Sequence, residues 1–132
     1  HFFPALIKKI YQIKIGKKKN LTLWGNGSAK REVRYVDDLA DACVFFMKKK
    51  TKETIINIGT GKDYSIKQYT KIISDVIIPK KKFQLNFDNT KPNGTPRKVL
   101  DVSLALKYGW KSKTDLYNAI KITYENFKSL NK

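Results

Sequence analysis

Two short segments of this sequence carry the residues best suited to bind an anionic ligand. In the first, Trp24 is followed by a Gly-Asn-Gly turn and then by Lys30 and Arg31. A flat aromatic ring beside a turn, with a guanidinium nearby, suits a base or sugar ring attached to a phosphate. Trp24 and Arg31 are therefore candidate ligand contacts. The alternative is that Trp24 is a core aromatic residue at the end of a strand.

The second segment is the loop from Lys91 to Lys98. Its two prolines and one glycine restrict the backbone, so its polar side chains are held in place. It carries two kinds of useful group, cations and hydrogen-bonding side chains: Lys91, Asn93, Thr95, Arg97 and Lys98. Such a loop could clamp a diphosphate, or it could simply be a rigid surface turn.

Several common catalytic motifs are incomplete in this sequence. Gly59-Thr-Gly-Lys62 is similar to a phosphate-binding loop, but Ile56 and Asp63 occupy positions where that motif needs Gly and Ser or Thr. A Gly-x-Gly-x-x-Gly dinucleotide fingerprint is absent, and no Tyr-x-x-x-Lys follows a plausible Ser on a neighbouring strand. His1 is the only histidine and Cys43 the only cysteine, so we expect no metal site.

Hydrophobic periodicity places these segments on an alternating α/β framework. A helix is predicted from Pro4 onward, with Leu6, Ile7, Ile10 and Ile13 on one face. Further helices are predicted after Asp37 or Asp38, after a Ser65–Gln68 capping box, after Asp101, and after Thr114 or Asp115. The predicted strands are Leu21–Trp24, Val33–Val36, Thr54–Ile58 and Phe83–Phe87.

Two of these strands suggest an incomplete sheet. Thr54–Ile58 is almost wholly apolar, as in a strand buried on both faces, and Val33–Val36 is short. Both look built to join a sheet that this chain alone does not complete. Because the sequence begins at His1 rather than Met, we expect a fragment or a processed product. In the helix that follows Val36, the spacing predicts that Cys43, Phe46 and Met47 are buried.

Composition excludes several classes of protein. The 132 residues are 41% hydrophobic and 12% aromatic, which is enough for a core and argues against full disorder. The sequence contains no apolar run near the ~20 residues needed to span a bilayer, and no secretory signal. A single cysteine allows no intrachain disulfide. We therefore expect a cytosolic protein that does not bind membranes.

The formal net charge of +17 raises the possibility of nucleic-acid binding. Only three of the 28 basic residues are arginine, however, and arginine is the residue that reads base edges most effectively. The lysines are spread along the chain, with short clusters at residues 17–19, 48–50 and 80–82. We favour a solvated basic surface, and keep a basic nucleic-acid-associated domain as the alternative of a different class.

Four segments together resemble one enzyme family, the GDP-L-fucose synthases. These enzymes are extended short-chain dehydrogenases of the NAD-dependent epimerase/dehydratase group. The loop Lys-Pro-Asn-Gly-Thr-Pro-Arg-Lys is the most specific of the four, whereas Arg-Glu-Val-Arg-Tyr-Val-Asp-Asp is shared by many nucleotide-sugar enzymes. The segments that carry the resemblance are residues 1–7, 23–40, 57–61 and 91–101.

The resemblance implies a fold and a domain organisation. Members of the family have a Rossmann domain that binds NADP(H) and a smaller C-terminal domain that binds the GDP-sugar. By this resemblance, residues 1–132 are the C-terminal part, mainly the GDP-sugar-binding domain. Segments near residues 33–58 would complete the Rossmann domain. Most of that domain, including the main NADP(H) contacts and the Ser/Tyr/Lys set, would lie upstream.

The resemblance also implies roles for individual residues. His1 matches the family histidine that lies near the nicotinamide and is proposed as the acid in epimerisation, so it is both a catalytic and a cofactor-binding candidate. Asn93 stands where many relatives have Asp, which keeps an acceptor oxygen but removes the charge. The substrate-binding candidates are Lys9, Trp24, Arg31, Asn93 and Lys98.

The implied reaction converts GDP-4-keto-6-deoxy-D-mannose to GDP-L-fucose by 3,5-epimerisation and NADPH-dependent 4-reduction. We expect the isolated chain to be inactive, and the full-length enzyme to be a cytoplasmic homodimer that binds no specific nucleic acid. Another extended short-chain nucleotide-sugar epimerase or dehydratase is the alternative enzyme.

Overall fold

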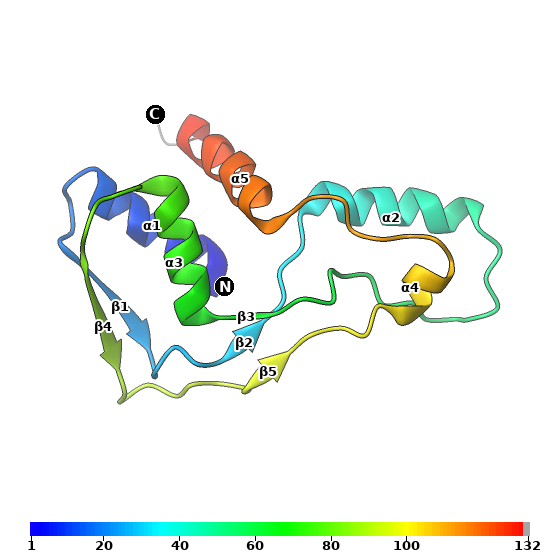
Figure 1. Cartoon of the computed structure of the whole chain (residues 1–132), viewed down its shortest axis with the longest axis horizontal. Helices are drawn as coiled ribbons and strands as arrows, with labels where there is room; N and C mark the ends of the chain where they lie inside the picture. Colours follow the sequence, from blue (N-terminus) through cyan, green and yellow to red (C-terminus); the bar gives the residue numbers. More distant parts are fainter. Residues whose placement is uncertain (131–132) are drawn as a thin grey trace.

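A computed structural model describes residues 1–130 and shows two groups of elements joined by a small three-stranded sheet (Figure 1). One group contains the helices α1 (Phe2–Lys14), α3 (Ile66–Ile77) and α5 (Leu116–Leu130). The other contains α2 (Val36–Lys48) and the short α4 (Ser103–Lys107). Each group has its own hydrophobic cluster.

The larger group is built on a two-stranded parallel sheet. Strand β1 (Asn20–Trp24) pairs with β4 (Gln84–Asp88), with Asn20 opposite Gln84 and Trp24 opposite Asp88. Alternate β1 side chains, Leu21 and Leu23, are buried beneath the helices. The predicted α1 face is confirmed, since all four of its apolar residues are buried: Leu6, Ile7, Ile10 and Ile13.

Helix starts in this group follow the predicted capping chemistry. The Ser65 hydroxyl accepts from the Gln68 N–H at 3.1 Å, and the Gln68 side chain accepts from the Ser65 N–H at 2.8 Å. This capping box satisfies two N–H groups that would otherwise lack partners at the start of α3. The Asp115 carboxylate likewise accepts from the Asn118 N–H at 3.0 Å at the start of α5.

The small sheet links the two groups. Its central strand β2 (Lys30–Arg31) pairs antiparallel with β3 (Tyr64–Ser65) and parallel with β5 (Arg97–Lys98). Each strand has only two residues, so side chains and loops must supply most of the stabilisation.

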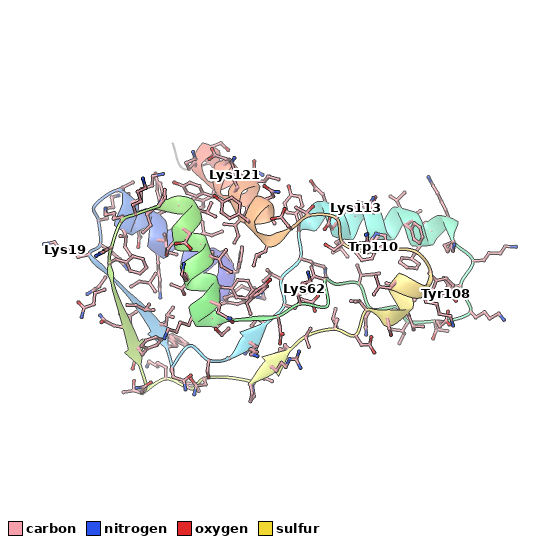
Figure 2. The ribbon with its side chains drawn as sticks, viewed as in Figure 1. Lys19, Lys62, Tyr108, Trp110, Lys113 and Lys121 are labelled. Carbon is pink, nitrogen blue, oxygen red and sulfur yellow. The ribbon has the colours of Figure 1, made fainter. Side chains whose placement is uncertain are left out.

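The second group depends on two aspartates of α2. The buried Asp38 carboxylate accepts from the Thr114 hydroxyl at 2.8 Å, the Thr114 N–H at 3.0 Å and the Lys113 N–H at 3.1 Å, and it also accepts from the Ser112 hydroxyl. Asp41 accepts from the Trp110 indole N–H at 2.9 Å. Figure 2 shows Trp110 and Lys113 on the segment that runs below α2.

Four sequence predictions about the second group are wrong. Val33–Val36 is not a strand, because residues 33–35 are irregular and Val36 already belongs to a helix. Helix α2 begins at Val36 rather than at an aspartate cap, and its N-cap residue is Tyr35, without a side-chain hydrogen bond. Thr54–Ile58 is irregular, and Ile55 is 78% exposed. A strand needs a hydrogen-bonded neighbour, and none of the described residues pairs with this segment. Asp101 precedes the N-cap of α4, Val102, although its carboxylate accepts from the Ser103 N–H.

The predicted burial along α2 is also wrong for two residues. Cys43 is exposed and Met47 is 85% exposed, whereas Phe46 packs in the second cluster as predicted. Their spacing is helical, but they share an outward stripe with Val36, Ala40 and Val44. Helix α2 is therefore apolar on two faces, and one of them has no partner among the described residues.

Among residues 1–130, the structure has no helix that is long and apolar enough to cross a membrane.

We predict that Asp38→Asn lowers the free energy of unfolding by about 2 kcal/mol at pH 7, because it removes the charge that four donors share. Burial alone would raise the pKa of Asp38, but the hydrogen bonds from Ser112, Thr114 and Lys113 outweigh it and lower the pKa. The stabilisation is therefore present above the ordinary pKa of about 3.9 and is lost as the pH falls through the lower folded value.

Urea unfolding at pH 7 and at pH 3 measures this effect. The difference between the wild type and Asp38→Asn should shrink at the lower pH. Asp37→Asn is the matched control, because Asp37 is exposed on the same first turn. Equal losses for the two variants at pH 7 would contradict the role assigned to Asp38.

Candidate functional site

The candidate site extends from the carboxyl ends of one pair of parallel strands, β1 and β4, along a second pair, β2 and β5, which leads away from them (Figure 1). Trp24 and Asp88 are opposite each other at the carboxyl ends of β1 and β4, and Arg31 and Lys98 are opposite each other at the ends of β2 and β5. Ligands of α/β proteins commonly bind beyond the carboxyl ends of parallel strands. The fold thus brings together segments that are about 70 residues apart in sequence.

Trp24 is presented to solvent beside the loop that follows β4. Its side chain is 67% exposed, so it is not the core residue of the alternative prediction. The Lys91 ammonium lies 6.0 Å from the centroid of the indole ring. An exposed indole beside a cation is suited to stack against a base or a sugar face and to hold a nearby phosphate.

Asn93 joins this loop to the turn after Trp24. Its Oδ1 accepts from the Asn26 N–H at 2.7 Å. A Cβ atom on Gly25 would lie only 2.1 Å from the same oxygen, and Gly25 has a φ of 61°, so this position requires glycine. The Asn93 oxygen therefore accepts from the backbone in this structure, and the residue is exposed.

Arg31 fixes the other half of the same loop. Its Nη1 donates to the carbonyl oxygens of Thr95 and Lys30, each at 2.6 Å. Within residues 1–130, no partner is found for its Nε and Nη2 groups. Because residues opposite each other in parallel strands point to the same face, the exposed Lys98 side chain lies beside Arg31. Together they provide two cations for an anionic group.

Arg97 belongs to the opposite face of this sheet. Its guanidinium bonds to the Asp63 carboxylate, with Nε 2.6 Å from Oδ2. That hydrogen bond lowers the pKa of Asp63 and raises the pKa of Arg97. Arg97 is therefore engaged structurally, which leaves Lys98 and Lys91 as the loop cations available to a ligand.

Glu32 is the main positioning residue of the site. It lies in the Arg-Glu-Val-Arg-Tyr-Val-Asp-Asp segment but was not among the site residues predicted from sequence. Its Oε1 accepts from the Gly61 N–H at 3.0 Å, the Thr60 hydroxyl at 3.1 Å and the Thr60 N–H, and its Oε2 accepts from the Leu100 N–H at 2.8 Å. A Cβ on Gly59 would lie 2.3 Å from Oε1. One carboxylate thus ties the turn at residues 59–61 to the chain after β5.

A buried tyrosine connects β2 with the start of α1. The Tyr69 hydroxyl donates to the Arg31 carbonyl oxygen at 2.9 Å, and burial raises the pKa of this phenol. The Tyr69 ring packs against Phe2 and Phe3, with ring centroids 5.4 and 5.8 Å away. The position of His1, immediately before Phe2, is therefore set relative to Arg31 through Tyr69.

His1 itself lies at a different opening from Trp24. It is exposed, has no side-chain capping role, and lines a cavity of about 1010 Å³ together with Glu32, Arg34 and Lys62. Trp24, Arg31, Asn93 and Lys98 do not line this cavity. Residues 31 and 32 lie between the two places, with Arg31 on the loop side and Glu32 on the cavity side.

Lys9 is not brought to either place. Its ammonium donates to the Thr22 carbonyl oxygen at 3.1 Å, in the middle of β1. This contact anchors α1 on the sheet, so a substrate role for Lys9 remains a prediction. Residues 1–130 contain no cluster of His, Cys, Asp and Glu that could hold a metal ion.

Two tyrosines of α5 have a lysine four positions later, Tyr117 with Lys121 and Tyr124 with Lys128. Neither pair forms a catalytic unit here. Tyr124 is buried and its hydroxyl accepts from Lys14 at 3.1 Å, while Lys128 pairs with Glu125 at 2.6 Å.

Comparison with known proteins places this arrangement in a family. The profile described as "NAD dependent epimerase/dehydratase family" matches residues 1–59, from the start of α1 to the turn held by Glu32. The match covers fewer than half of the 132 residues, and the rest of the chain is compared through individual relatives. GDP-L-fucose synthase 1 from Arabidopsis thaliana is 37% identical to it over 125 residues, which cover 95% of this chain and 38% of that protein.

Two other relatives act on different sugars, according to their names. GDP-L-colitose synthase from Yersinia pseudotuberculosis is 38% identical over 96% of this chain and 41% of its own length. The structure of an NADP-bound GDP-mannoheptose C4 reductase from Campylobacter jejuni is 32% identical, with a TM-score of 0.81 over 97% of this chain and 45% of that one.

The chain thus spans well under half the length of these relatives. The fold class predicted from sequence, part of an extended short-chain dehydrogenase with a Rossmann-type α/β fold, is confirmed.

We predict that Glu32→Ala lowers the midpoint of thermal unfolding by roughly 4 °C or more, because four donors lose a shared acceptor. Glu125→Ala should shift the midpoint by about 1 °C or less, since Glu125 is an exposed residue paired with Lys128. Differential scanning fluorimetry on both variants measures this. Equal midpoints for the two variants would contradict the role of Glu32.

Proposed function

We propose that this chain is the GDP-sugar-binding part of a GDP-L-fucose synthase, which makes GDP-L-fucose from GDP-4-keto-6-deoxy-D-mannose. The observation that carries the proposal is that the loop with Asn93 and Lys98 is joined to the segments of both Trp24 and Arg31, by the Asn26–Asn93 and Arg31–Thr95 hydrogen bonds and by the pairing of β2 with β5. The similarity to GDP-L-fucose synthase over 95% of the chain supports it.

Each of these residues has a part in holding the nucleotide. Lys98 and the free edge of the Arg31 guanidinium face the diphosphate, where an Arg fork can bind two oxygens. Trp24 supplies an exposed ring for a flat or apolar face of the ligand. Because Asn93 Oδ1 accepts from Asn26, its amide N–H₂ is the group that donates to the GDP-sugar. Asn93 stands at the position of the family Asp, and its amide N–H₂ replaces one carboxylate oxygen, so that a donor takes the place of an acceptor.

His1 is the residue proposed to transfer a proton. A carbonyl at C4 of the hexose makes the C3 and C5 protons acidic, and an acid is then needed to return a proton on the other face. An exposed imidazole at a cavity mouth can supply that proton near neutral pH. The cavity has room for part of a dinucleotide, and Lys62 and Arg34 give its lining positive charge. When bound, NADPH supplies the hydride for reduction at C4.

The two hydrophobic clusters support the proposed domain assignment. We assign the cluster around α1, α3 and α5 to the substrate-binding unit. The second cluster joins residues of 42–58 to Ala105 and Trp110. The exposed stripe of α2 and the unpaired segment Thr54–Ile58 are apolar surfaces of the kind that pack against a Rossmann sheet. We assign them to that domain of the full-length enzyme, which we propose to be a cytoplasmic homodimer.

The similarity to GDP-L-colitose synthase favours one alternative, another GDP-sugar enzyme that uses the same nucleotide contacts and a different hexose. This alternative keeps the GDP site and changes only the sugar.

We predict that the 132-residue chain binds GDP, and that Lys98→Gln weakens the affinity about tenfold by removing one diphosphate contact. Lys121→Gln is the matched control, since Lys121 lies on α5 away from the site (Figure 2). Isothermal titration calorimetry with GDP and with guanosine measures both effects, and guanosine should not distinguish Lys98→Gln from the wild type. Steeply salt-dependent DNA binding without any preference for GDP would instead favour the nucleic-acid alternative.

We predict that the chain alone consumes no NADPH when GDP-4-keto-6-deoxy-D-mannose is supplied, because its sequence contains neither a dinucleotide fingerprint nor a complete Ser/Tyr/Lys set. Absorbance at the NADPH band measures this. Steady NADPH oxidation by the purified chain would contradict the proposal that this chain binds the GDP-sugar while the main NADP(H) contacts and the Ser/Tyr/Lys set lie outside it.

A further inference from the structure

A second concave surface lies away from the candidate site, between the outer face of α3 and the chain that leads into β4. It is a groove of about 540 Å³. The lining residues of α3, together with its C-cap residue Ile78, recur at helical spacing from Lys67 onward, so the groove follows about 16 Å of the helix axis. That length matches about five residues of extended chain.

The floor of this groove, here called the α3–β4 groove, is apolar. Ile78, Phe83 and Leu85 contribute hydrophobic side chains to it. Thr70 and Ser74 also line it, but their hydroxyls donate to the carbonyl oxygens of Ile66 and Thr70, at 2.8 and 2.7 Å. Because these donors are used within the helix, the floor offers a ligand little hydrogen bonding and mainly apolar contact.

The rim of the groove is strongly cationic. Five lysines line it, against a single acidic residue, Asp75, which is paired with Lys71 at 2.7 Å. Lys81 is engaged elsewhere, since its ammonium donates to the Ile13 carbonyl oxygen at 2.6 Å. Lys67 lies toward β4, with its ammonium 5.9 Å from the Phe87 ring centroid. Lys67, Lys80 and Lys82 are therefore the cations that remain for a ligand.

We propose that the α3–β4 groove binds an extended acidic segment of a partner protein, with aliphatic side chains on the floor and carboxylates against the rim lysines. The charge of the rim selects an acidic ligand. The concave apolar floor disfavours a flat bilayer surface, which cannot reach it. A nucleic-acid strand offers far fewer aliphatic groups to the floor than a peptide with aliphatic side chains, and the lining residues include no arginine. This inference does not depend on the proposed enzymatic function.

Fluorescence anisotropy with labelled ten-residue peptides tests this proposal. A peptide of alternating Glu and Leu should bind the 132-residue chain. Alternating Gln and Leu, which would still adhere to any exposed apolar surface such as the α2 stripe, should bind about tenfold more weakly. Alternating Glu and Ser should also bind about tenfold more weakly, because it lacks groups for the floor.

Paired variants locate the site. Lys67→Gln combined with Lys82→Gln should weaken Glu/Leu peptide binding about tenfold, whereas Lys8→Gln combined with Lys121→Gln removes the same charge elsewhere and should not. Circular dichroism checks that both variants fold, and equal GDP affinity would show that the groove is separate from the nucleotide site. Equal binding of the Glu/Leu and Gln/Leu peptides would overturn the proposal. So would equal effects of the two double variants, or binding of anionic vesicles or duplex DNA through the groove lysines in place of the peptide.

Discussion

The Glu32 carboxylate is the interaction on which the arrangement of this chain most depends. The three-stranded sheet has only two residues in each strand, which is too little backbone pairing to hold loops 70 residues apart in sequence. Glu32 compensates by accepting from Thr60, Gly61 and Leu100 at once. Arg31, its neighbour, points the other way and fixes Thr95. Two adjacent residues thus organise both sides of the sheet, the cavity at His1 and the loop at Asn93.

The larger group of elements could be predicted from sequence because its signals are local. The apolar face of α1, the Ser65–Gln68 capping box and the alternation at Phe83–Phe87 all lie within a few residues of one another. The site residues Trp24, Arg31, Asn93 and Lys98 could be proposed for the same reason, since each belongs to a short segment with a chemical character of its own. Their convergence depended on parallel pairings between distant segments, which no local pattern specifies.

The sequence predictions that were wrong have a common physical cause. Cys43, Met47 and Ile55 are apolar and helically or alternately spaced, yet they are exposed, because periodicity identifies an apolar face without identifying what covers it. Glu32 was not predicted as a site residue, because its neighbours in sequence, Arg31 and Arg34, suggest an ordinary charged surface. Its role depends on Gly59 and Leu100, which only the fold brings next to it. The +17 charge shows the same limit, since most lysines are exposed but a few of them line the candidate site and the α3–β4 groove.

We propose that β2 and the loop at residues 91–98 form a single nucleotide site that begins at the carboxyl ends of β1 and β4. Two-dimensional ¹H–¹⁵N NMR of the labelled chain during titration with GDP tests it directly. We expect the largest chemical-shift changes on the amides of residues 24–31 and 91–98 and on the Trp24 indole N–H. The indole N–H of the buried Trp110, which is bonded to Asp41, should stay unchanged. Shift changes confined to other elements, or none at saturating GDP, would contradict it.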